Sequence, residues 1–284
     1  MRWKPRGCGA SEISLWTQIG PSWQYRQMRK LLLGSAALLL VVPTISLAGK
    51  KVTAGDQSLQ ITAKISPAKP KAGISLDLSV DYESLNDAAQ IKENTKSVAL
   101  KMPPSTKFHT DRYATCLVSA AIANPDACPA ESKVGEGTAT ADARPTLPTP
   151  VDATVVAYNA MDDTNPDGSP RNPAVPSILL IAKVPSLNNY AAALPFDIHG
   201  STAQLDYSPP QPGGSQLFHL QKVHIVFASR GKTSYMTAPS SCPKSKKWPV
   251  KMTITNFDGP SVTATHQVAC GKKKSGGGAY AYGR

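Results

Sequence analysis

This chain has few features that indicate a chemistry. Aromatic residues make up only 6% and charged residues 18% of its 284 residues. It contains no C-x-x-C pair, no G-x-S-x-G elbow and no H-x-x-x-H spacing among its five histidines, so the common zinc and serine-hydrolase motifs are missing. A catalytic triad or a carboxylate pair can still assemble from distant positions. The sequence therefore assigns no catalytic residue, and a non-enzymatic protein is favoured.

Long apolar runs are also missing. A helix needs about 20 apolar residues to cross a bilayer. The most apolar stretch, Leu31–Ala48, is only 18 residues long and is interrupted by Pro43. This stretch follows Arg29 and Lys30 and ends in small residues, which is the pattern of a secretory signal peptide. We expect a signal peptide at residues 28–48, cleaved near Ala48, with retention as a membrane anchor as the alternative.

The expected signal peptide determines how the rest of the chain is interpreted. Residues 1–27 are interpreted as a misassigned upstream start or a long n-region, and they are left out of the fold prediction. The chain after residue 48 is predicted to be secreted, as an extracellular or cell-wall associated protein.

The excess of basic residues is confined to one end of the chain. The formal net charge is +12. Residues 49–241 carry 17 basic and 17 acidic side chains, whereas residues 242–284 carry eight basic residues and one acid, Asp258. An anionic cell-wall polymer or a membrane surface would suit this end, and a solvated loop and tail is the alternative. Nucleic acid is not expected as a partner of an exported chain. The lysines expected to make the contact are Lys244, Lys246, Lys247, Lys272, Lys273 and Lys274.

Four cysteines remain after residue 48, namely Cys116, Cys128, Cys242 and Cys270. An even number in an exported chain indicates disulfide bonds, and four cysteines allow three pairings. The spacing favours the two local closures, first with second and third with fourth. In the chain-entropy model each bridge contributes about 3–4 kcal/mol to stability.

Alternation of apolar and polar residues predicts strands. The clearest example is Ile74–Tyr82, and the continuous apolar run Ile178–Val184 suits a strand buried on both faces. Helical patterns are scarce, at Leu117–Ala123 and Ser84–Lys92. We therefore predict an all-β fold, an antiparallel β-sandwich of immunoglobulin-like or jelly-roll-like type with few or no long helices. Further strands are predicted at Leu59–Ile65, Val98–Met102, Val151–Tyr158, Leu217–Phe227, Val250–Thr255 and Val262–Val268.

The proline-rich segment Ala141–Pro150 suggests a boundary. It would separate an N-terminal β-rich part, residues 49–140, from a C-terminal β-rich part, residues 151–270. One large sandwich with this segment as a surface loop is the alternative to two small ones. Residues 271–284, GKKKSGGGAYAYGR, are expected to form a disordered basic tail.

Asp163, Asn165 and Asp167, followed by Gly168, match the first half of the calcium loop D-x-[DN]-x-[DN]-G. The closing glutamate of that loop would stand at position 174, which is Ala174. Aspartate, asparagine and glycine are also the usual residues of a turn between strands. A turn is favoured, calcium is retained as the alternative, and no other cofactor is expected.

The segment Cys116–Thr140 reads CLVSAAIANPDACPAESKVGEGTAT. It resembles the block C-x(n)-CP-x-x-S-x-V-G-x-G-x-A of uncharacterised secreted proteins from actinobacterial genomes. The resemblance implies an exported β-rich domain with Cys116–Cys128 and Cys242–Cys270 paired, and it implies no activity. It spans residues 95–270 and continues through Tyr158-Asn159, Ile178–Ile181, Pro239–Cys242, Trp248, Phe257–Gly259 and Cys270.

Together these patterns predict an exported, non-enzymatic binding or structural component of the bacterial cell envelope. The alternatives are a secreted hydrolase acting on cell-wall or extracellular carbohydrate and a calcium-stabilised adhesion module. The oligomeric state is not predicted.

Overall fold

The computed structural model describes residues 49–84, 95–142, 150–187, 190–207, 219–228, 234–257 and 259–271. The predicted signal peptide, most of the helix predicted at Ser84–Lys92 and the lysines at positions 272–274 lie outside these ranges. Among the helices within these ranges, none is both long and apolar enough to span a bilayer.

The described residues form fifteen strands, because apolar and polar residues alternate along most of them. Twelve follow one continuous order, β1-β2-β3-β12-β7-β8-β9-β10-β11-β4-β14-β15, and each neighbouring pair in it is antiparallel. These twelve are β1 (Val52–Ala54), β2 (Gln57–Ser66), β3 (Gly73–Ser84), β4 (Thr95–Lys101), β7 (Lys133–Asp142), β8 (Val151–Thr164), β9 (Pro170–Val184), β10 (Tyr190–His199), β11 (Thr202–Asp206), β12 (His219–Phe227), β14 (Lys247–Asn256) and β15 (Val262–Ala269).

The remaining elements are short. They are the strands β5 (Lys107–Phe108), β6 (Cys116–Leu117) and β13 (Met236–Thr237), the helix α1 (Val118–Ala123), and three 3-10 turns at Thr110–Arg112, Ala130–Ser132 and Pro185–Leu187. The helix predicted at Leu117–Ala123 is therefore confirmed as α1. Strands β5 and β13 pair with each other at the start of β3, and β6 pairs in parallel with β8.

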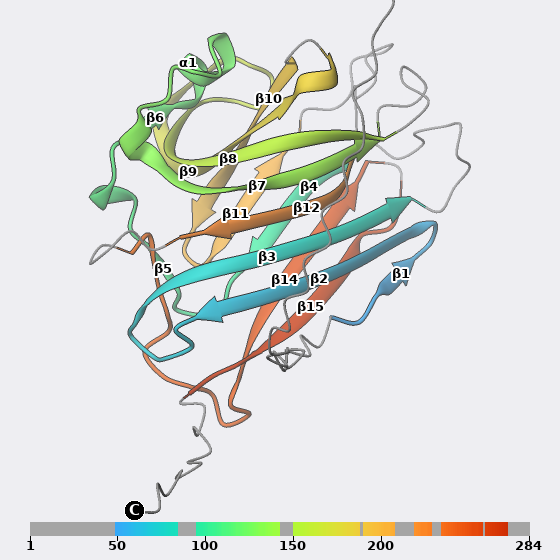
Figure 1. Cartoon of the computed structure of the whole chain (residues 1–284), viewed down its shortest axis with the longest axis vertical. Helices are drawn as coiled ribbons and strands as arrows, with labels where there is room; N and C mark the ends of the chain where they lie inside the picture. Colours follow the sequence, from blue (N-terminus) through green and yellow to red (C-terminus); the bar gives the residue numbers. More distant parts are fainter. Residues whose placement is uncertain are drawn as a thin grey trace, which may run out of the picture. The chain divides into compact units, whose positions relative to one another are not determined.

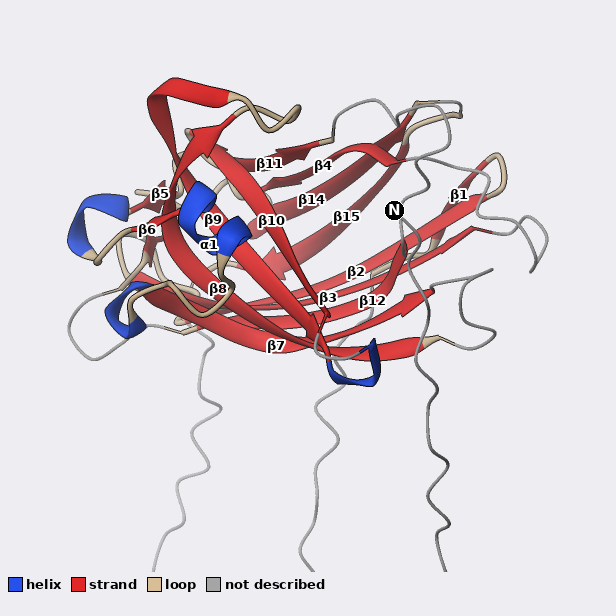
Figure 2. Ribbon diagram, turned by 90° about the horizontal axis from the view of Figure 1, so that it is seen from above, coloured by secondary structure: helices blue, strands red, loops and turns tan. Residues whose placement is uncertain are grey.

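The sheet curls until its two edges meet. Strand β15 packs against β2 and β1, although no hydrogen-bonded ladder joins β15 to β2 in the part of the chain that is described. The side-chain amide of Gln57 in β2 donates to the carbonyl oxygen of Pro260, just before β15, at 3.1 Å. Figures 1 and 2 show the strands wrapping around a common interior, with β3 and β7 on one side and β4, β11 and β14 on the other. The result is a nearly closed, barrel-like sheet.

The predicted all-β antiparallel class is confirmed, whereas the sandwich is not. The strands make one sheet whose apolar face turns onto itself instead of meeting a second sheet. Strands from residues 49–140 and 151–270 are interleaved in it, since β12 lies between β3 and β7. The two parts of the chain thus contribute to the same barrel-like sheet.

Besides the short strands β1, β5, β6 and β13, three longer strands lie where the sequence predicted none, β7, β10 and β11. Strand β7 contains two glycines and two alanines and β10 contains three alanines, and both residue types have low intrinsic preference for strands. The structure explains one of these residues: a Cβ atom on Gly137 in β7 would lie 1.9 Å from the carbonyl oxygen of His224 in β12. Glycine at this position lets the two strands approach closely.

One end of the barrel is filled with large side chains. Met102, Tyr235, Met236 and Trp248 are each at most 2% exposed. The ring of Tyr235 also makes edge contacts with Phe108 and Tyr113, at centroid distances of 6.1 and 5.4 Å. This end lies where β3 and β14 begin and β4 ends.

Helix α1 covers a second, smaller apolar cluster on the outer face of the sheet. Val118 and Ala121 of α1 pack against Ala160 in β8 and against Leu179 and Ile181 in β9. On the opposite face of β9, Ile178 and Ala182 belong to the main core. The second half of β9 is thus buried on both faces, as the continuous apolar run Ile178–Val184 predicted.

Candidate ligand-binding cavity

Beyond its filled end, the interior of the barrel is hollow. The cavity has a volume of about 260 Å³, and a cavity of about 150 Å³ with apolar walls is enough to hold benzene. None of the described lining residues is charged, and only Tyr82, Thr95 and Tyr207 carry polar side chains. The described lining residues are Leu78, Val80, Tyr82, Thr95, Val98, Leu100, Val155, Ile178, Leu180, Ala182, Leu194, Phe196, Ala203, Leu205, Tyr207, Val223, Ile225, Phe227, Met252 and Ile254.

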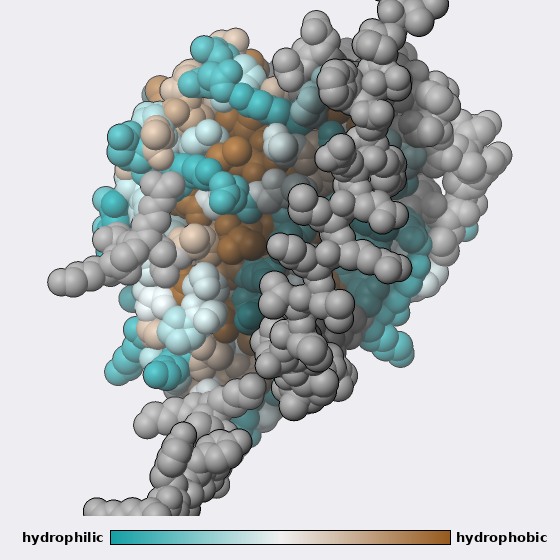
Figure 3. Space-filling view, in the orientation of Figure 1, coloured by the Kyte–Doolittle hydropathy of each residue, from teal (hydrophilic) through white to brown (hydrophobic). Residues whose placement is uncertain are grey.

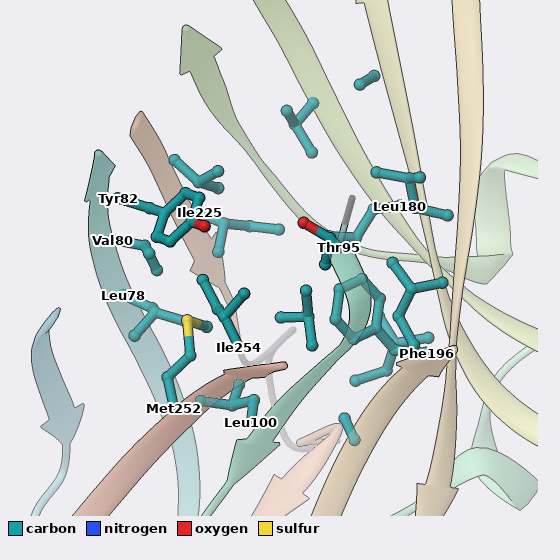
Figure 4. A pocket seen from close by; sticks show the side chains of 18 of the residues that line it. Leu78, Val80, Tyr82, Thr95, Leu100, Leu180, Phe196, Ile225, Met252 and Ile254 are labelled. Carbon is teal, nitrogen blue, oxygen red and sulfur yellow. The ribbon is translucent and has the colours of Figure 1, made fainter. Parts of the chain in front are cut away.

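The cavity follows from strand number and alternation. A barrel of about eight strands is just wide enough for side chains to fill, and wider barrels enclose cavities. Twelve strands follow one another here, and every second residue faces inward, as Leu78, Val80 and Tyr82 do on β3. Figure 4 shows side chains from β3, β14, β4 and β9 converging on the same space. The described lining comes from eight of the strands, β3, β4, β8, β9, β10, β11, β12 and β14.

Solvent reaches part of this apolar wall. Val98, Leu180 and Phe196 point into the cavity, yet each is only partly buried. Figure 3 shows apolar atoms at the surface in the middle of the drawn face, between hydrophilic margins. A packed core would bury such side chains almost completely. The interior thus offers accessible apolar surface to a small molecule.

The inward-facing layer at the end of the cavity opposite the filled end is polar. Tyr82 lies near the end of β3, Thr95 begins β4 opposite Asn256, and Tyr207 follows β11. The backbone N–H of Tyr207 donates to the carbonyl oxygen of Lys96 at 2.9 Å, which holds Tyr207 beside Thr95. Gln57 starts the inward row of β2 and is fully buried. This polar layer, defined as Gln57, Tyr82, Thr95, Tyr207 and Asn256, lies opposite the filled end.

The polar layer is uncharged at neutral pH. Burial raises the pKa of Tyr207 to about 12, so its hydroxyl stays protonated. Charged neighbours such as Asp81, Glu83 and Asp206 alternate onto the outer face. The described part of the cavity therefore presents hydrogen-bonding groups at one end and no countercharge for an ionic ligand.

A second hollow of about 460 Å³ lies on the outer face of β2, β3, β12 and β7. It is shallow and polar, and its walls include Thr62, Asp81, Thr138, Lys222 and His224. The ring of His224 already contacts the carboxylate of Asp77 at 2.9 Å. The deep, apolar interior cavity is the better ligand site, because most of a bound ligand's surface would be buried there.

The four cysteines pair as their spacing predicted. Cys116–Cys128 and Cys242–Cys270 lie at disulfide distance, with Cα atoms 5.0 and 5.8 Å apart. The first bridge lies beside α1 on the outer face, and the second joins the loop before β14 to the residue after β15. Both are remote from the polar layer, so they stabilise the frame of the barrel.

The predicted calcium loop is the turn between β8 and β9. The carboxylate of Asp167 accepts hydrogen bonds from the backbone and hydroxyl of Ser169, and the side chain of Asn165 donates to Ser169 and Pro170. Asp163 is bonded to Ser119 in α1 instead. No group of three His, Cys, Asp or Glu that could hold a metal occurs among the residues described. Calcium binding by this loop stays a prediction.

Asp163 ties the β8–β9 hairpin to α1. Its carboxylate accepts the backbone N–H of Ser119 at 2.9 Å and the hydroxyl at 2.5 Å. Partial burial opposes its charge, but these hydrogen bonds prevail and hold the pKa of Asp163 below its usual value. Such a carboxyl adds stability above its unfolded-state pKa of about 3.9, and that stability is lost as the pH falls through the folded-state pKa.

We therefore expect Asp163→Asn to lower the free energy of unfolding by about 1 kcal/mol at neutral pH. The difference from the unmodified protein should shrink as the pH falls through the lowered pKa of Asp163, because the side chain then becomes neutral in both proteins. Urea denaturation at neutral pH and at an acidic pH measures it. Ser119→Ala should show the same pH dependence, and exposed Asp206→Asn should not. An equal loss for Asp163→Asn at both pH values would contradict the assignment.

Two carboxylates do meet in the fold, at Asp162 in β8 and Asp197 in β10. Arg171 contacts both, with its Nη1 atom 2.6 Å from Asp197 and 3.4 Å from Asp162. Burial raises the pKa of Asp197, against the hydrogen bond and charge of Arg171, and the nearby Asp162 raises it further. Neither aspartate lines either hollow. This pair does not form a glycosidase cleft, and hydrolase activity stays a prediction without an assigned site.

The structure places three of the predicted polymer-binding lysines. Lys244, Lys246 and Lys247 are exposed around the Cys242–Cys270 bridge, at the start of β14. They lie at the opposite end of the barrel from the polar layer. Contact with an anionic polymer stays a prediction.

Sequence reasoning missed the cavity, although it found several of the strands that form it. The inward positions Val98, Ile178 and Val223 lie on strands that the sequence predicted, but the prediction assigned no cavity to them. One signal was present in the sequence: small residues stand on the inward rows, such as Ala182 and Ala203.

Comparison of the chain with protein-family models, curated proteins and solved structures finds no match.

Proposed function

We propose that this protein is an exported binding protein of the bacterial cell envelope that holds a small apolar ligand inside its barrel. The observation that carries the proposal is the uncharged cavity of about 260 Å³ with accessible apolar walls. Burial of apolar ligand surface contributes about 25 cal/mol per Å². Because the protein's own side chains leave the interior unfilled, the burial of an apolar ligand there can contribute this free energy to binding.

Export is supported by the signal-peptide pattern of Met28–Ala48 and by the two cysteine pairs, which are compatible with an oxidising compartment. The exposed Lys244, Lys246 and Lys247 would keep the protein at an anionic cell-wall polymer or membrane surface. In this proposal the two activities use opposite ends of the barrel. The ligand enters near the polar layer, and the lysines contact the envelope.

The proposal is tested by titrating the folded, disulfide-bonded protein with N-phenyl-1-naphthylamine, a neutral dye whose fluorescence rises in apolar surroundings. We expect a saturable rise with one site per chain, reversed by an excess of decane. The reduced protein unfolded in urea serves as the control and should give no saturable signal. A dye signal that does not saturate, or that decane leaves unchanged, would refute the proposal.

A further inference from the structure

The ends of the cavity differ in chemistry, and this difference restricts the ligand. The walls toward the filled end, which include Leu78, Leu100 and Met252, are apolar, and beyond them large side chains fill the barrel. The polar layer at the other end contains two tyrosine hydroxyls and a threonine hydroxyl. Figure 4 shows the oxygen atoms of Tyr82 and Thr95 on the same side of the pocket, away from Leu100 and Met252. A ligand would meet hydrogen-bonding groups only at this end.

Among the described residues, this layer has no charged group that could balance a charge on a ligand. The described walls contain no Lys, Arg or His, and the acidic neighbours Asp81 and Glu83 face outward. An ionised carboxylate moved into such surroundings loses its hydration without gaining a partner. A hydroxyl group, in contrast, can both donate to and accept from neutral side chains.

From these observations we infer that the cavity selects an uncharged amphiphile, an apolar body ending in a hydroxyl group, and holds that hydroxyl at the polar layer. The inference rests on the proposed function, because it specifies the ligand of the same cavity. The apolar body lies against Leu100 and Met252, and the hydroxyl lies beside Tyr207. Long-chain alcohols represent this class, and the corresponding carboxylates are excluded from it at neutral pH.

The experiment compares three competitors of equal chain length, decanol, decanoate and decane, by their displacement of bound N-phenyl-1-naphthylamine. We expect decanol to displace the dye at a concentration at least about tenfold lower than decanoate at pH 8, because the carboxylate must shed its charge or its hydration. At pH 4, where much more of decanoic acid is neutral, the difference should shrink.

The substitution Tyr207→Phe tests whether the ligand's hydroxyl group lies at the polar layer. Loss of one hydroxyl should weaken decanol binding about fivefold and leave decane and the dye unchanged, since only decanol uses the hydrogen bond. Tyr158→Phe, on the outer face of β8, is the matched control and should change none of the three. Equal displacement by decanol and decanoate at pH 8, or an unaltered decanol affinity in Tyr207→Phe, would overturn the inference while dye binding still supports the proposed function. Absence of dye binding would instead refute the proposed function itself.

Discussion

Val223→Phe should bind N-phenyl-1-naphthylamine at least about tenfold more weakly than the unmodified protein. Val223 lies on β12 between Val80 and Ala139 of the neighbouring strands, faces the cavity and is only partly buried. The additional ring atoms would occupy space that the ligand needs. Because they fill an existing hollow, the midpoint of thermal unfolding should stay unchanged or rise.

Two further variants make this result specific. Lys222→Phe adds the same ring to the adjacent residue, which is exposed on the outer face, and should leave dye affinity unchanged. Val98→Phe fills the cavity from β4, six strands away in the order of the sheet, and should repeat the loss. If both filled variants fold and bind the dye as tightly as the unmodified protein, the ligand does not occupy the interior.

Trp248→Ala should have the largest effect on stability among single substitutions in the described core. Trp248 is 2% exposed on the inward row of β14, and its indole N–H donates to the carbonyl oxygen of Ser241 at 3.3 Å. Truncating a buried tryptophan leaves a cavity and costs about 3–5 kcal/mol. Equilibrium denaturation should therefore show a large fall in the free energy of unfolding.

Lys247→Ala is the matched control for Trp248→Ala. Lys247 precedes Trp248 on the same strand but is exposed, so its removal should change the free energy of unfolding by less than about 0.5 kcal/mol. A loss below about 1 kcal/mol in Trp248→Ala would mean that the large side chains do not form a rigid filled end. The cavity would then lack the closed floor that orients the proposed ligand.

Local sequence patterns predicted much of the frame of this fold. The alternation in Ile74–Tyr82 identifies both the strand and its inward face, since it depends only on neighbouring residues. The cysteine pairs could also be predicted, because the two local closures link residues separated by only 12 and 28 positions. Strand β10 was missed because alanines replace the usual β-branched residues. Two of them, Ala191 and Ala193, pack beside the cluster under α1.

The barrel and its cavity depend on relations that no local pattern carries. A strand with one apolar face has the same sequence pattern in a sandwich, where that face packs on a second sheet, and in a barrel, where it packs on other strands of the same sheet. Whether the interior is full depends on side chains from strands far apart in the chain, such as Val98, Ala182 and Ile225. The polar layer likewise arises because Tyr82, Thr95 and Tyr207 end or begin different strands at the same end of the barrel.

The most direct test of the central claim is a crystal structure of the protein grown with 1-bromonaphthalene, a neutral apolar ligand whose bromine can be located by anomalous scattering. The account predicts one strong bromine peak inside the barrel, surrounded by Leu180, Phe196 and Ile225. A bromine peak on the outer face alone, or an interior occupied by the protein's own side chains, would contradict it.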